Sequence, residues 1–194
     1  MSTAAAISPR AARFAARLEA TAARLAPVQL PQSAGWLKRA REEALARLKG
    51  MGLPEKRDEY WRYTDPKRFL CEPAEPAVVF DANDEPVVFE SIDRLKLVFV
   101  DGVFDAAASD DLAGEGLEIC RLAEAGQADI HWAQDLYGVL EAEGQAPVPR
   151  PLAALNTAMA TDGVLIRATA RVERPVSLVY LRSGSDAEMS LHHV

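Results

Sequence analysis

The 194-residue sequence has only two cysteines, Cys71 and Cys120, and no apolar run near the roughly 20 residues that a membrane-spanning helix needs. Two cysteines cannot build a disulfide framework, and these two lie too far apart to form a CxxC metal knuckle. We therefore expect a protein of a reducing compartment, the cytoplasm, with no membrane-spanning segment.

Motifs of several catalytic classes are missing as well. No GxGxxG or GxxxxGK[ST] segment occurs, so nucleotide binding by a Rossmann fold or a P-loop has no support. There is no GxSxG segment, and no motif links His131 to either cysteine. His192 and His193 are adjacent, so on a strand they would point to opposite faces and could not hold one metal ion together. We expect no catalytic residue, no metal site and no bound cofactor in this chain.

Charge is distributed unevenly along a chain whose formal net charge is −7. Residues 1–70 hold 14 Lys and Arg against 7 acids, whereas residues 71–194 hold 8 against 22. A basic arm can bind nucleic acid, but this net charge gives no field that would favour it. The asymmetry instead indicates two differently built regions, and we expect no nucleic-acid partner.

The N-terminal region has a helical pattern. Ser8 and Pro9 are a favoured N-cap and first helical residue, and they predict that a first helix begins there. Arginines without acids in the first 18 residues also occur in transit peptides, but a first helix explains them more simply. A second helix is expected from a cap at Ser33 to the glycines Gly50 and Gly52.

The most distinctive stretch is residues 53–66, LPEKRDEYWRYTDP, which we call the aromatic elbow. Aromatic side chains so close to a helix start usually pin an irregular turn to the core, and we expect that role here. Stacking on nucleic-acid bases is the alternative, but acids in the same stretch would repel phosphates. Thr64 or Asp65 should cap a short helix that starts at Pro66.

The central region mixes short elements. An Asp-Gly pair between residues 95–100 and 103–104 predicts a β-hairpin. The other expected elements are a Pro-rich linker at 72–86, a strand at 117–122, and helices at 132–140 and 151–160.

The last region contains three β-rich stretches, which begin near Val164, Val176 and Met189 with turn residues and no helices between them. Such strands can form an antiparallel sandwich or the first rungs of a parallel β-helix, and the spacing leaves both open. The last stretch ends at Val194 without a closing turn, so we expect the natural protein to continue.

Three ordered segments resemble SufD proteins, within the SufB/SufD family of iron–sulfur cluster assembly proteins. Residues 52–64 resemble the GLP…RxDExWxYT segment, and residues 155–163, LNTAMATDG, are similar to the LN-A-A-DG stretch that opens the family's β-helix. Between them, residues 97–104 resemble its LVFVDG-type hairpin. The matching signature residues, which we expect to be structural, are Arg57, Asp58, Glu59, Trp61, Tyr63, Thr64, Asn156, Asp162 and Gly163.

The resemblance implies an α+β chain in which an N-terminal helical domain is followed by the first rungs of a right-handed parallel β-helix, truncated at the end. We expect a helical region with the aromatic elbow at 1–72, a mixed connecting region with a β-hairpin at 73–150, and the start of the β-helix at 151–194.

The resemblance also implies a scaffold subunit of the Suf iron–sulfur cluster assembly complex that is not an enzyme. Its expected partners are SufB and the ATPase SufC, with contacts mostly beyond residue 194, and a homodimer is a further arrangement it allows. The iron–sulfur cluster would belong transiently to the full complex and not to this fragment.

Two rival functions remain. A β-helix enzyme such as a sugar-polymer lyase needs clustered carboxylates on one sheet face, whereas residues 164–181 offer mainly arginines and Glu173. The stronger rival is a non-catalytic helical adaptor that binds protein or RNA through the aromatic elbow. Salt-sensitive RNA binding would favour it.

Overall fold

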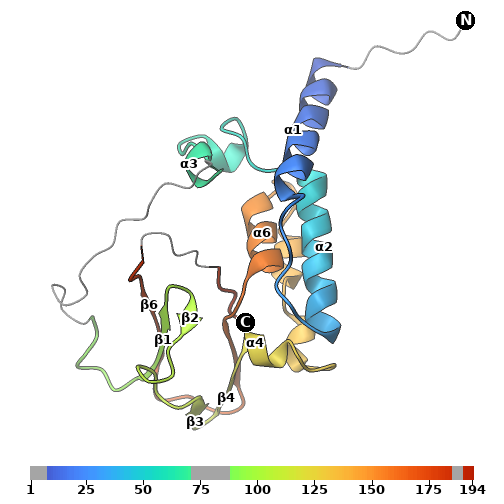
Figure 1. Cartoon of the computed structure of the whole chain (residues 1–194). Coiled ribbons are helices and arrows are strands. Elements are labelled where there is room, and N and C mark those ends of the chain that lie inside the picture. The colour runs from blue at the N-terminus through green and yellow to red at the C-terminus, as the bar shows by residue number, and fades with distance from the viewer. Residues whose placement is uncertain (1–7, 71–87, 185–189) are drawn as a thin grey trace, which may run out of the picture.

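The computed structural model of the chain describes residues 8–70, 88–184 and 190–194. The long helices lie on one side of the molecule, and two small sheets lie on the other (Figure 1). The prediction of helices followed by strands, an α+β fold, is confirmed. The Pro-rich linker expected at residues 72–86 falls outside the described residues.

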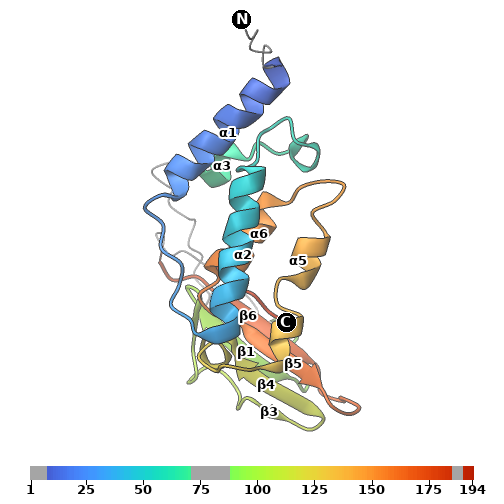
Figure 2. The same ribbon diagram turned by 90° about the vertical axis from the view of Figure 1, so that its right-hand side faces the viewer.

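Helix α1 (Pro9–Leu25) begins where the sequence predicts. The Ser8 side chain accepts a hydrogen bond from the Ala11 amide at 3.2 Å, and proline occupies the first turn. Only Thr21 and Leu25 of this helix are buried. Figure 2 shows the rest of α1 extending away from the other helices, so only its last turns join the core.

Helix α2 (Gly35–Met51) supplies the central apolar face of the helical side. The predicted cap at Ser33 is wrong, because Ala34 is the N-cap and the Ser33 hydroxyl instead bonds the Pro31 carbonyl. The helix ends at Gly52, whose φ of 75° suits glycine, while Gly50 lies inside the last turn. Helix α2 packs along α6 (Pro151–Met159), as the neighbouring ribbons in Figure 1 show.

A buried cation joins three segments of this helical side. Arg41 on α2 is 1% exposed and donates to the carbonyl oxygens of Pro31 (2.9 Å), Gln32 (3.4 Å) and Ala160 (2.6 Å). Burial lowers the pKa of the Arg41 guanidinium from its usual value, but backbone carbonyls supply the partial negative charge that a buried cation requires. The connection between α1 and α2 is thereby tied to the end of α6.

The elbow contains a 3₁₀-helix, Glu59–Trp61, and a short helix α3, Lys67–Leu70, follows it. Helix α3 begins one residue after the expected start at Pro66, and the Asp65 carboxylate accepts from the amide of its first residue, Lys67, at 3.1 Å. Among the described residues, no helix is both long enough and apolar enough to cross a membrane.

One sheet has the strand order β2-β1-β6. Strands β1 (Leu95–Val100) and β2 (Val103–Phe104) form the predicted antiparallel hairpin, with positive φ at Asp101 and Gly102. Strand β6 (Val176–Leu181) pairs in parallel along the other edge of β1.

The second sheet has the order β3-β4-β5 and is antiparallel. Its strands are β3 (Ala113–Gly114), β4 (Leu117–Arg121) and β5 (Val164–Ala168). Residues 191–194 run parallel to β5, with a bridge between Leu191 and Asp162 and a hydrogen bond from the Val194 amide to the Val164 carbonyl. Leu95, Leu97, Phe99, Ile119 and Val164 fill the core between the two sheets.

Within the described residues these strands form two small sheets, one mixed and one antiparallel, and not the expected parallel β-helix. The segment that connects β4 to β5 includes the helices α4 (Leu122–Ala125), α5 (Val139–Glu143) and α6. Strand β5 then runs in the direction opposite to β4 and pairs antiparallel with it. The helix expected at 132–140 is divided, because Gly138 has a φ of 74°. It becomes a 3₁₀-helix, Trp132–Asp135, followed by α5, Val139–Glu143.

We predict that replacing Arg41 by methionine lowers the free energy of unfolding by about 2–3 kcal/mol, because buried carbonyls lose their donors while the apolar stem is kept. Urea unfolding followed by circular dichroism measures the change. Arg39→Met, at an exposed position of the same helix, is the control and should stay within about 0.5 kcal/mol of the parent. An Arg41→Met protein as stable as the parent would show that the cation is not needed.

Candidate functional site

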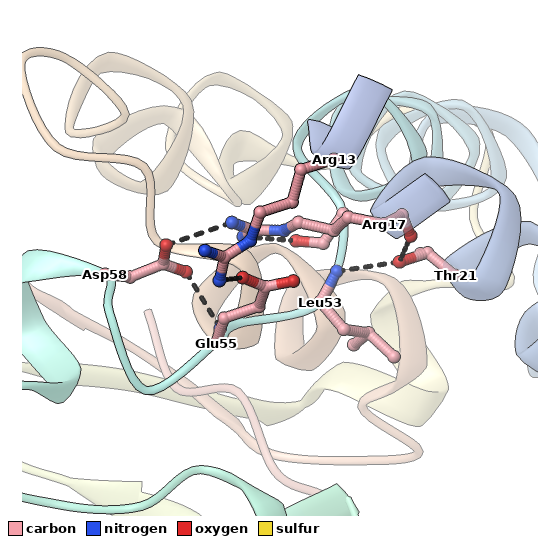
Figure 3. Close-up of polar contacts among 7 residues, drawn as sticks. Arg13, Arg17, Thr21, Leu53, Glu55 and Asp58 are labelled. Carbon is pink, nitrogen blue, oxygen red and sulfur yellow. Dashed lines mark hydrogen bonds and ion pairs between the residues drawn. The ribbon is translucent and has the colours of Figure 1, made fainter. Parts of the chain in front are cut away.

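The first signature segment is held by an ionic clamp between α1 and the elbow. Arg17 donates to the Asp58 carboxylate at 3.0 Å and to the Gly52 carbonyl at 3.1 Å, and Arg13 pairs with Glu55 at 2.5 Å. Figure 3 shows both arginines reaching from α1 across to these carboxylates. The second Asp58 oxygen accepts from the Glu55 amide at 2.9 Å. The signature residue Asp58 therefore joins the elbow to α1 and also closes the first turn of the elbow.

A hydroxyl reinforces the clamp (Figure 3). Thr21 donates to the Arg17 carbonyl at 2.8 Å and accepts from the Leu53 amide at 2.9 Å. Thr21 is 2% exposed, so this hydroxyl is shielded from water and both of its hydrogen bonds lie within the protein. The last turns of α1 thus fix where the elbow begins.

The prediction that the elbow aromatics pin the turn to the core is wrong for two of the three. Tyr63 is 91% exposed and Tyr60 is 56% exposed, whereas Trp61 is half-buried. The 3₁₀-helix includes Tyr60 and Trp61 and ends before Tyr63, which lies in the turn that follows. The guanidinium groups of Arg62 and Arg150 lie 5.6 Å from the ring centroids of Tyr63 and Tyr60.

Three other signature residues of the elbow are exposed too, namely Arg57, Glu59 and Thr64. Neither Arg57 nor Glu59 has a hydrogen-bond or ion-pair partner for its side chain within the described part of the chain. The fold therefore accounts for Asp58 and leaves these neighbours available at the surface.

The second signature segment holds the last residues in place. Asn156 donates to the Leu191 carbonyl at 3.0 Å and accepts from the Ser190 hydroxyl at 3.1 Å. At Gly163, a Cβ atom would lie 1.9 Å from the His192 carbonyl oxygen, so no larger residue fits without moving the backbone. Asn156 and Gly163 together create the space and the hydrogen bonds for residues 190–194.

Asp162 connects the same junction to β4. Asp162 is 4% exposed, and its carboxylate accepts hydrogen bonds from the Arg121 guanidinium, with Nε at 3.0 Å, and from the Ala123 amide at 3.0 Å. Ala123 lies in the first turn of the short helix α4 (Leu122–Ala125), which follows β4 directly. A buried carboxylate with both a cation and a backbone donor is fully compensated, so its part here is structural.

A family model described as the SufBD protein N-terminal region matches residues 28–178. The chain belongs to the SufB/SufD family. Members of this SufB/SufD family are associated with iron–sulfur cluster assembly. No curated protein sequence matches the chain. The matched range contains both signature segments and begins after α1, so the arginines of the clamp come from a helix that precedes the matched region.

The two C-terminal histidines of this family member face different elements. The ring of His192 lies 4.3 Å from that of Tyr137, whereas His193 lies 5.9 Å from both Phe99 and Tyr180. Nδ1 of His193 accepts from the Val164 amide at 3.0 Å, so its proton is on Nε2, which donates to the Tyr180 hydroxyl at 2.7 Å. Burial lowers the pKa of both histidines, and this favours their neutral forms.

The structure brings together a cysteine and a histidine that no sequence motif connects. His131 Nε2 lies 3.5 Å from the Cys120 sulfur, and its Nδ1 accepts from the Ala133 amide at 3.2 Å. Burial raises the pKa of the Cys120 thiol, and nearby Glu118 and Glu124 raise it further, which makes it a weak nucleophile. Cys71 lies outside the described residues. Within residues 8–70, 88–184 and 190–194, no three His, Cys, Asp or Glu side chains gather as metal ligands.

We predict that Gly163→Ala lowers the free energy of unfolding by about 3 kcal/mol, because its new methyl group would collide with backbone at His192. Gly50→Ala is the matched control. An added Cβ there meets nothing within 4 Å and lies in a helix, so stability should rise by up to about 1 kcal/mol. Equal melting curves for the two variants would contradict the close packing of residues 190–194 on Gly163.

We also predict that acid weakens the attachment of residues 190–194. Protonation of His193 would place a second proton opposite the Val164 amide, and its folded-state pKa is lowered. The contribution of neutral His193 to the free energy of unfolding is therefore complete above the ordinary histidine pKa of about 6.5. It is lost as the pH falls through the lowered pKa of His193 in the folded protein. Urea unfolding at several pH values measures this loss.

The control for this pH dependence is His193→Asn, whose side-chain oxygen can still accept from the Val164 amide but does not titrate. Groups distant from residue 193 contribute equally to both proteins, while the charge of His193 also lowers the pKa of His192, so the difference between the two curves reports on His193 together with its effect on His192. Parallel curves would show that His193 does not couple folding to pH.

Proposed function

We propose that the chain is the N-terminal part of a SufD-type scaffold subunit that supports iron–sulfur cluster assembly together with SufB and SufC. The observation that carries this proposal is the ordered pair of signature segments inside the family match at residues 28–178. The hydrogen bonds of Asp58, Asn156 and Asp162 give these segments a structural purpose in the chain itself. Contacts that hold the chain's own segments together are what a scaffold subunit requires.

In this proposal the chain performs no chemical turnover of its own and holds no resident cofactor. The iron–sulfur cluster is the cargo of the assembled complex, and ATP hydrolysis belongs to SufC. The raised pKa of Cys120 supports this assignment, because a neutral, half-buried thiol is a poor ligand and a poor nucleophile. The proposed place of action is the cytoplasm.

We also propose that the strands belong to the opening of a parallel β-helix. Two parallel pairings support it: β1 with β6, and residues 191–194 with the start of β5. The second pairing joins Asp162 to Leu191, and this separation falls within the roughly 20–45 residues of one solenoid repeat. The first pairing joins Leu95 to Val176, which are farther apart than one repeat. The antiparallel pair of β4 and β5 would then cover the first rung.

Co-purification tests the scaffold proposal. Tagged complete natural protein should capture SufB and SufC, whereas the 194-residue chain should capture neither, because the expected contacts lie mostly beyond residue 194. Circular dichroism would first establish that both baits are folded. A folded complete protein that captures neither partner would refute the proposal.

The exposed face of the elbow favours one second candidate, a non-catalytic adaptor. Tyr60 and Tyr63 point outward with arginines beside their rings, and tyrosine and arginine are enriched at binding hot spots. Salt-sensitive binding of RNA to the isolated chain, lost in a Tyr60→Ala, Tyr63→Ala double variant, would favour this candidate.

A further inference from the structure

A groove of about 620 Å³ lies between α1 and the elbow, beside the ionic clamp. One wall is α1, with Arg10, Phe14 and the clamp arginines, and the other is the elbow, with Glu55, Arg57 and Asp58. The elbow wall lies within the family match and the α1 wall precedes it. The groove is thus a feature of this chain that the family match alone does not describe.

The charges of the groove are not balanced. Arg13 and Arg17 are paired with Glu55 and Asp58. Arg10 and Arg57 also line the groove, and no described residue provides either of them with a carboxylate or carbonyl partner. Two unused guanidinium groups therefore remain after the clamp has formed.

An apolar side chain accompanies these cations. Phe14 on α1 is 46% exposed and lines the groove with Ala11. Neither belongs to the buried clusters that hold the helices and sheets together. A large apolar side chain beside unpaired arginines contributes little to the fold, but it is the combination that binding surfaces use.

We propose that this groove binds an acidic peptide segment of a partner protein, one that carries carboxylates on both sides of an apolar side chain. The carboxylates would pair with Arg10 and Arg57, because planar guanidinium groups bind carboxylates through two parallel hydrogen bonds. The apolar side chain would cover Phe14. The proposal concerns this surface alone and does not depend on SufB or SufC.

Charge selects this occupant over two others. A nucleic-acid strand carries phosphates at close intervals, and they would meet Glu55 and Asp58 in the same groove. A second copy has the acidic residues to fit, but two chains of net charge −7 repel each other overall. A short acidic segment can place its few carboxylates at Arg10 and Arg57, away from Glu55 and Asp58, whereas a nucleic-acid strand carries a phosphate at every nucleotide. It also carries fewer negative charges than a second chain, so the overall repulsion is weaker.

Fluorescence anisotropy with the 194-residue chain tests the proposal. The probe is a fluorescein-labelled peptide with two glutamates on each side of a Leu-Phe pair, and the control peptide has Ser-Ser in the centre. The chain should bind the probe saturably and the control peptide at least about tenfold more weakly, because burying two apolar side chains is worth that much.

Matched variants locate the binding. Arg10→Glu and Arg57→Glu should each weaken binding by about tenfold or more, and Phe14→Ala should weaken it as well. Arg39→Glu makes the same charge change at an exposed position of α2 outside the groove, and should have little effect. Thermal melts of all the variants confirm that they remain folded.

Three outcomes would overturn the proposal. The first is no saturable binding of the probe, and the second is equal weakening by Arg39→Glu, which would indicate non-specific charge attraction. The third is a different occupant, seen as displacement of the probe by an oligouridylate or as a dimer that Arg57→Glu dissociates. The assay contains neither SufB nor SufC, so a failure to bind the peptide would not contradict the scaffold proposal. A failed co-purification would likewise not contradict peptide binding in the groove.

Discussion

The carboxylate of Asp162 is the point at which the helical side of the molecule meets the sheets. One oxygen holds the first turn of α4 through the Ala123 amide, and the other holds Arg121 at the end of β4. Its backbone carbonyl also accepts from the His192 amide at 3.0 Å. A charge that is 4% exposed is costly unless all of these partners are present. Asp162 therefore fixes three parts of the fold at once, namely the position of α4, the start of β5 and the path of residues 190–194.

The family signature contains two kinds of residue. Asp58, Asn156, Asp162 and Gly163 are explained by contacts within the chain, because each holds a segment that is distant in sequence. The exposed side chains of the elbow are not explained in this way. Structural signatures keep a fold in register, whereas exposed ones are expected where another molecule is recognised. The elbow combines the two within a few residues.

Local signals predicted local structure well. A serine and a proline marked the start of α1, Asp-Gly marked the turn of the hairpin, and Asp65 accepts from the first amide of α3. Each of these depends on the conformational preference of one or two residues, which a sequence displays directly. The division of the helix at 132–140 depends on a single glycine, Gly138. A glycine in a sequence can adopt either sign of φ, so its presence alone does not predict a positive φ.

Long-range arrangement was less predictable. Nothing in the sequence of β5 states that it pairs antiparallel with β4 while β6 pairs in parallel with β1. The pairing follows from the path of the helices between the strands, and strand spacing leaves that path open. The proximity of Cys120 and His131, and the outward direction of Tyr60 and Tyr63, depend on the same tertiary placement.

The attachment of α1 has a consequence for how the molecule can vary. Its last turns are buried through Thr21 and Leu25, while the rest of its length is held by arginine head groups at the ends of long, flexible stems. The cores around α2, α6 and the sheets close mainly without it. Helix α1 is therefore packed against the core only near its C-terminal end, and the part before it contacts the elbow through ion pairs. A change in the angle of the first turns of α1 would therefore act on the elbow through the arginine pairs and leave the packed cores unchanged.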